Sequence, residues 1–88
     1  MDSLAVVELV MHAESDLGVT LAEADVHALR DGTAADLWRL VVAARSGRVP
    51  STAEPLSADP IWHQVRGWLA LRHDVPAVTI TPAQRLLP

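Results

Sequence analysis

Ser3 is the residue whose type and position most suggest chemistry. It stands between Asp2 and Leu4, directly before a stretch with helical periodicity. A serine in this position is commonly an N-cap, because its side-chain oxygen accepts a hydrogen bond from an amide of the first turn. As a nucleophile it would need a base, and His12 with Asp16 is the pair to consider. On one helix Ser3 and His12 are roughly 13 Å apart along the axis, which excludes a triad, and we predict no catalytic residue.

The histidines do not form a metal-binding pattern. They are His12, His27, His63 and His73. They fall in different segments, no two of them are four residues apart, and the chain has no cysteine. Zinc sites need several such ligands in close spacing, so we predict no metal site. The absence of cysteine also fits a reducing compartment, and we expect a cytoplasmic protein.

Acidic residues dominate the first half of the chain. Residues 1–48 hold eight acidic residues and four arginines, whereas residues 49–88 hold three of each, so the whole net charge of −4 lies in the first half. The negative electrostatic potential of this half repels phosphate backbones and anionic membrane surfaces. In addition, the longest run of apolar residues is far shorter than a membrane-spanning helix needs. We therefore expect no nucleic acid and no membrane as partners, and basic protein surfaces instead.

Residues 3–17 predict the first helix. Its apolar positions form one stripe, consisting of Leu4, Val7, Val10, Met11 and Leu17. Gly18 follows as a left-handed stop, and Asp2 or Ser3 can cap the start. Residues 21–29 predict one or two further helical turns, with the apolar positions Leu21, Val26 and Leu29.

The next helix begins after a break at Asp31-Gly32. Thr33 and Asp36 have the spacing of a capping box, in which each side chain accepts a hydrogen bond from the other residue's backbone amide. The apolar positions that follow have helical spacing: Leu37, Leu40, Val41 and Ala44.

Residues 46–58 predict a linker, because they are rich in Pro, Ser, Ala and Gly and lack periodicity. At about 3.3 Å per residue, such a segment is long enough to carry the chain from one end of a bundle to the other. Asp59 as N-cap and Pro60 at the first helical position then predict a helix that ends before Pro76. Its inward stripe consists of Ile61, Val65, Trp68 and Leu69.

The two tryptophans of this helix are expected to differ. Trp62 and Trp68 lie on different faces, and we predict that Trp68 fills the core while Trp62 is interfacial. Residues 77–88 predict an irregular, partly buried loop, with Ile80, Leu86 and Leu87 pointing inward. Together the elements predict one all-α domain, a bundle of three main helices and one short helix.

Most of the chain resembles the acyl carrier protein family. The stretches DSLAVVELVMHAESDLGV, TLAEADVHAL and GTAADLWRLV are similar to its second, third and fourth helices, beginning with the DSL motif. IWHQVRGWLALRHDVPAVTITPAQRLLP resembles the first helix and the long loop, which precede DSL in ordinary members. The resemblance implies an acyl-carrier-like four-helix bundle with permuted helix order. Residues 1–45 then supply the DSL-motif helix and the two that follow, residues 46–58 the linker, and residues 59–88 the usual N-terminal part.

The resemblance also implies a function. In this family a phosphopantetheinyl transferase esterifies the DSL serine, here Ser3, using coenzyme A and magnesium. The resulting 4'-phosphopantetheine arm carries acyl groups as thioesters, so the chain would be a carrier without catalytic activity in fatty-acid or polyketide biosynthesis. A helix N-terminus suits this modification, because its amides and the positive end of its dipole favour a phosphodiester.

Partner enzymes of such a carrier are the transferase and acyl-transferring or ketosynthase-type enzymes with basic surfaces. The resemblance implies that the face presented to them includes Asp2, Leu4, Glu8, Met11 and Glu14. Without the resemblance, the two glutamates belong to a solvated helix face. Leu4 and Met11 are then interpreted as partial core.

The chain also departs from the family pattern. The Asp-Leu-Gly usual before DSL is missing, and His73 and Asp74 stand where Leu and Gly are usual. Ala5 and Ser15 replace acids common on the second helix of fatty-acid carriers, which leaves room for a specialised polyketide-type pathway. One alternative is an unmodified carrier-like interaction module. Another concerns assembly: instead of a monomer, residues 1–45 of one chain can pack against residues 60–88 of another in a domain-swapped dimer.

Overall fold

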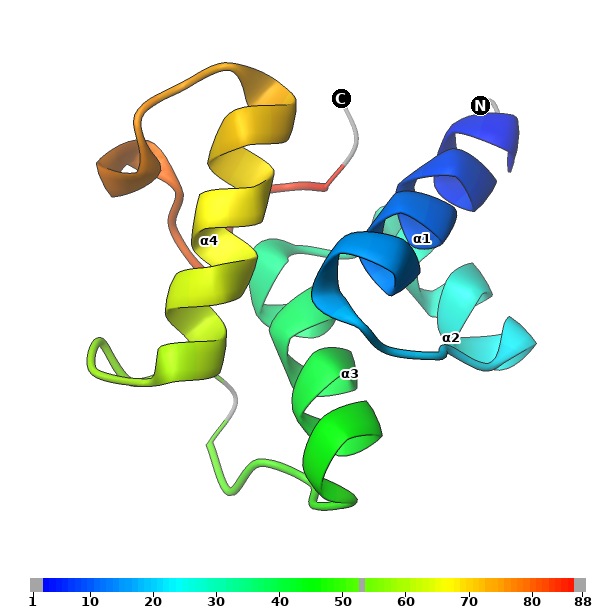
Figure 1. Cartoon of the computed structure of the whole chain (residues 1–88), viewed down its shortest axis with the longest axis horizontal. Coiled ribbons are helices and arrows are strands. Elements are labelled where there is room, and N and C mark those ends of the chain that lie inside the picture. The colour runs from blue at the N-terminus through cyan, green and yellow to red at the C-terminus, as the bar shows by residue number, and fades with distance from the viewer. Residues whose placement is uncertain (1–2, 53, 87–88) are drawn as a thin grey trace.

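Four α-helices form a small bundle in the computed structural model, which describes residues 3–52 and 54–86. They are α1 (Ser3–Leu17), α2 (Glu23–Ala28), α3 (Ala34–Ser46) and α4 (Pro60–His73). Two short 3-10 helices, η1 (Leu29–Asp31) and η2 (Ala77–Thr79), follow α2 and α4. The predicted all-α fold of three long helices and one short one is confirmed. α3 and α4 make the most extensive helix contact and run in opposite directions (Figure 1), and α1 packs against α2, η1 and α4.

Three of the predicted helix ends are present, whereas the predicted cap of α1 by Asp2 or Ser3 lies outside the described residues. Gly18 takes a left-handed φ of 68° directly after α1. In the capping box of α3, Asp36 Oδ2 accepts from the Thr33 amide at 2.9 Å, and Thr33 Oγ1 accepts from the Asp36 amide at 3.4 Å. Asp59 Oδ1 accepts from two amides in the first turn of α4, at 2.8 and 3.2 Å. These ends depend on residues within three positions of each other, which is why their spacing predicts them.

The segment after η2 closes over the start of α3. The Ala34 amide donates to the Gln84 carbonyl at 2.8 Å, and the Ala35 amide donates to the Pro82 carbonyl at 3.0 Å. The Leu86 amide in turn donates to the loop before α3, at 3.2 Å. The first amides of a helix lack acceptors within the helix itself. The last described part of the chain therefore supplies acceptors that α3 needs.

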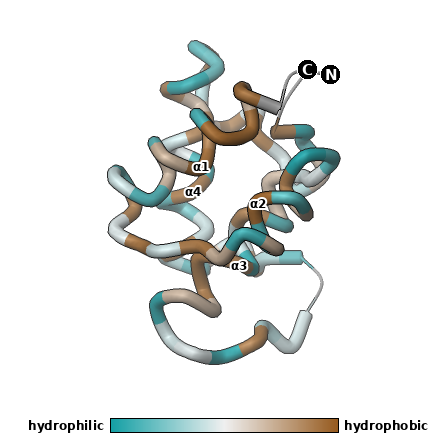
Figure 2. Tube along the Cα trace, turned by 90° about the vertical axis from the view of Figure 1, so that its right-hand side faces the viewer, coloured by the Kyte–Doolittle hydropathy of each residue, from teal (hydrophilic) through white to brown (hydrophobic). Residues whose placement is uncertain are grey.

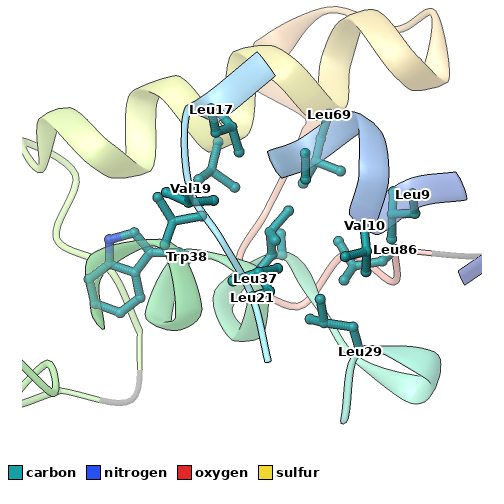
Figure 3. Packing of buried hydrophobic residues seen from close by; sticks show 14 of the residues in the cluster. Leu9, Val10, Leu17, Val19, Leu21, Leu29, Leu37, Trp38, Leu69 and Leu86 are labelled. Atoms are coloured by element: carbon teal, nitrogen blue, oxygen red, sulfur yellow. The ribbon is translucent and has the colours of Figure 1, made fainter. Parts of the chain in front are cut away.

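Buried side chains from both sides of the linker share one core (Figure 3). Leu9 of α1, Leu37 of α3, Leu69 of α4 and Leu86 are all nearly or fully buried. Ile80 is buried as well, as predicted, whereas Leu87 lies outside the described residues. Residues 3–46 and 60–86 therefore form a single apolar interior within one chain.

The predicted inward stripe of α1 is wrong in part. Leu4, Val7 and Met11 are exposed, by 60%, 43% and 60% of their surface. The buried face instead consists of Val6, Leu9, Val10, Ala13 and Leu17. α1 is apolar on two opposite sides, and the predicted stripe combined positions from both.

The α4 tryptophans differ from the prediction: Trp62 belongs to the core, and Trp68 is partly buried and packs against the core from its edge. Trp62 is only 4% exposed and belongs to the core, whereas Trp68 is partly exposed. The Trp68 indole N–H donates to Asp16 Oδ2 at 2.8 Å, a bond that keeps this ring at the surface between α1 and α4.

The linker does not run along the bundle. Because α3 and α4 are antiparallel, it joins neighbouring ends of the two helices. Both views show residues 47–52 at the lower end of the molecule, where hydrophobic and hydrophilic residues mix (Figures 1 and 2). The linker therefore does not have to be extended to connect α3 with α4.

Candidate functional site

The start of α1 positions the candidate modification residue. Ser3 is the first helical residue, while its side chain and the whole of Asp2 lie outside the described part of the chain. The first turn of α1 contains no acidic residue. The amides and dipole of this turn make a locally positive end. The backbone environment of Ser3 therefore suits the anionic phosphodiester that a phosphopantetheine group would add.

Four residues form an outward surface on α1, here called the outer face: Leu4, Val7, Glu8 and Met11. They are spaced by three or four positions, so they neighbour one another on one side of the helix. All four are exposed. The interpretation of Leu4 and Met11 as partial core is wrong, and Val7 is a surface residue that the sequence pattern assigned to the core. An exposed apolar group of this kind suits contact with another molecule.

Glu14 differs from Glu8. It is partly buried, and its Oε2 accepts a hydrogen bond from the Leu21 amide at 2.9 Å. Glu14 therefore holds the loop between α1 and α2, whereas Glu8 projects from the outer face. The structure brings Leu4, Glu8 and Met11 together and gives Glu14 a structural role at the edge of that surface.

This difference predicts different effects of the same substitution. We expect Glu14→Ala to lower the free energy of unfolding by about 1–2 kcal/mol, because it removes a charged acceptor from a backbone amide. Glu8→Ala is the matched control and is expected to change stability by less than about 0.5 kcal/mol. Urea unfolding followed by circular dichroism measures both. Equal losses in the two variants would contradict the assignment of Glu14 to the loop.

A polar cluster joins α1 to α4 on the side of α1 next to the outer face. It consists of His12, Asp16, Trp68 and Arg72. Arg72 donates to His12 Nδ1 at 2.9 Å, and its guanidinium lies 5.6 Å from the centre of the Trp68 ring. Because arginine has only donors, His12 Nδ1 must act as the acceptor. With the bond from Trp68 to Asp16, two hydrogen bonds tie one side of α1 to α4, and the stacking of Arg72 on Trp68 lies within α4.

A small hollow lies next to Val7 of the outer face, on the side of α1 away from the polar cluster. It has a volume of about 100 Å³ and is lined by Val6 and Val7 of α1 and by Val26, His27 and Arg30 of α2 and η1. Sequence reasoning did not bring these residues together, because they become neighbours only when α2 packs beside α1.

Within the described residues, no group of three or more metal-ligating side chains lies close enough together to hold an ion. In the same part of the chain, no helix has the length and apolar character that crossing a membrane requires.

Comparison with known proteins gives no relative. The chain matches no protein-family model, and neither a curated protein nor a solved structure matches it.

Proposed function

We propose that this chain is an acyl carrier protein with permuted helix order. Ser3 carries 4'-phosphopantetheine, and the arm holds acyl intermediates as thioesters during fatty-acid or polyketide biosynthesis in the cytoplasm. The carrier itself performs no catalysis. The single observation that carries the proposal is the outer face of α1, a mixed apolar and acidic surface that begins one residue after Ser3.

The arrangement of elements supports this proposal. The long helix with the DSL motif, the short helix and the following long helix come in the order that the resemblance implies. α4 and the segment after it pack into the same core and cap α3. The part of the chain that is similar to the family's N-terminal region thus occupies a place in the bundle although it comes last in the sequence.

The site also fits the group to be attached. A phosphopantetheine group supplies a flexible arm whose terminal thiol forms thioesters. The chain contributes the hydroxyl of Ser3 and the amides of the first turn of α1, and that turn contains no acidic residue. Positive potential at a helix start favours an attached phosphate.

The outer face suits partner enzymes with basic surfaces. Its apolar side chains provide contact area, and Glu8 provides charge. The net charge of −4 adds long-range attraction to such surfaces. Charges of this kind mainly raise association rates and select partners. The transferase and ketosynthase-type enzymes are the expected partners.

Modification by a transferase tests the proposal. The folded protein is incubated with a broad-specificity phosphopantetheinyl transferase, coenzyme A and magnesium, and its intact mass is measured. We expect the mass of one phosphopantetheinyl group to be added. An unmodified protein that retains its helical circular dichroism would reject the carrier proposal and favour the carrier-like interaction module. Light scattering on the same sample separates the monomer from the domain-swapped dimer.

A further inference from the structure

The neighbouring helices α1 and α4 carry opposite charges. α1 contains acidic residues and no arginine, whereas α4 contains arginines and no acidic residue. The acidic residues are Glu8, Glu14 and Asp16, and the arginines are Arg66 and Arg72. The two helices run in broadly opposite directions (Figure 1) and touch through the polar cluster. The surface that they form together is therefore acidic along α1 and basic along α4.

A hollow lies in this surface between the two helices. It has a volume of about 240 Å³ and is here called the seam hollow. Its lining consists of His12, Asp16, Trp68, Leu71 and Arg72. The two hydrogen bonds that join the helices here are exposed to solvent, so the hollow is open to another molecule. Its volume is below the roughly 300–1,000 Å³ of small-molecule sites, but it accommodates a protruding side chain.

Exposed apolar side chains border the seam hollow on both helices. On α1, Met11 of the outer face directly precedes His12 and is largely exposed. On α4, Leu71 lines the hollow and is more exposed still, and the exposed Val75 follows one helical turn later. Apolar side chains that are grouped in this way, rather than scattered singly, are typical of a contact surface.

Gly67 gives α4 room for the close approach of another helix. It lies four positions before Leu71, and therefore on the same side of α4. A Cβ atom at Gly67 would meet no atom of another part of the chain within 4 Å, among the described residues. Glycine destabilises a helix interior relative to alanine, and packing within the chain does not require it here. A glycine at this position lowers the distance at which a second backbone can pack.

We propose that two copies of this chain form a symmetric dimer through α1 and α4. α1 of each copy lies across α4 of the other, so Met11 enters the seam hollow of the other copy. Glu8 of one copy pairs with Arg72 of the other. Arg72 uses one of its five N–H donors in the bond to His12, and further donors are available for a carboxylate.

Charge complementarity favours a second copy over other partners. A twofold contact uses the same surface on both copies, so that surface must contain both members of each interacting pair. The acidic and apolar α1 beside the basic and apolar α4 meets this requirement. A uniformly basic partner would match α1 alone, and a uniformly acidic one would match α4 alone.

The dimer does not depend on modification of Ser3. It covers part of the outer face, so self-association competes with the partner enzymes that the carrier proposal assigns to that face. This competition rests on the carrier proposal, whereas the dimer itself does not. We expect weak association, because small interfaces are typical of transient contacts.

Sedimentation equilibrium of the unmodified full chain tests the dimer. Samples span about 10 µM to about 1 mM, which covers weak association. We expect the average mass to rise with concentration from that of the monomer towards that of the dimer. Leu71→Glu should lower the association constant at least about tenfold, because it places a charge in the apolar contact. Leu56→Glu makes the same change at an exposed leucine of the linker and should leave association unchanged.

An exchange of charges identifies the pairing. Glu8→Arg and Arg72→Glu should each lower the association constant about tenfold, because two symmetric pairs change from attraction to repulsion. The double variant restores both pairs with exchanged charges, and its association constant should lie within about threefold of the wild type. Circular dichroism checks that each variant keeps its helices.

Three results would overturn the proposal. The first is a chain that stays monomeric over the whole concentration range. The second is a double variant that associates as weakly as the single variants, or an equal loss in Leu56→Glu and Leu71→Glu. The third is a dimer that survives dilution and is unaffected by Leu71→Glu, which would be the domain-swapped form.

Discussion

Leu69→Ala is expected to lower the free energy of unfolding by about 3–5 kcal/mol. Leu69 is fully buried on α4, in the core that α1, α3 and the segment after η2 also form. Removing its side chain loses apolar burial and leaves a cavity that the neighbours fill incompletely. Domains of this kind are stable by only about 5–15 kcal/mol, so the variant should lose a large share of its stability. Urea unfolding followed by circular dichroism gives the measurement.

Leu71→Ala is the matched control. It makes the same chemical change two positions along α4, where the side chain is 85% exposed. We expect a change of less than about 0.5 kcal/mol. Similar losses in both variants would show that α4 does not pack with the face described here, and the shared core of the two parts of the chain would be rejected.

Ser3→Ala is expected to abolish the phosphopantetheinyl adduct completely. The transferase needs a hydroxyl to esterify, and alanine has none. Alanine is also a strong helix former, so the variant should keep the helical circular dichroism of the wild type. Intact mass after incubation with transferase, coenzyme A and magnesium measures the result.

Ser15→Ala is the control for this substitution. Ser15 is exposed on the same helix, and its loss should leave the adduct unchanged. An adduct that persists in Ser3→Ala would show that another residue is modified. An adduct lost in Ser15→Ala as well as Ser3→Ala would indicate damage to the surface that the transferase recognises.

The candidate site could be predicted only in part. Ser3 at the start of a helix and Glu8 on its exposed side follow from residue type and spacing. Whether Leu4 and Met11 face inward did not follow, because α1 is apolar on two opposite sides and periodicity does not distinguish them. The packing of α4, η1 and α2 against the side with Leu9 and Val10 decides this. The other side remains exposed as the outer face.

The sequence by itself determined where the four helices lie and three of their ends. The capping box at Thr33 and Asp36, the cap at Asp59 and the stop at Gly18 use hydrogen bonds and backbone conformations within three or four residues, so local composition is sufficient. Only the tertiary structure decided which face of α1 is buried, that Trp62 rather than Trp68 enters the core, and that the carbonyls of Pro82 and Gln84 cap α3. These features depend on contacts between residues that are distant in the sequence, and local spacing carries no information about such contacts.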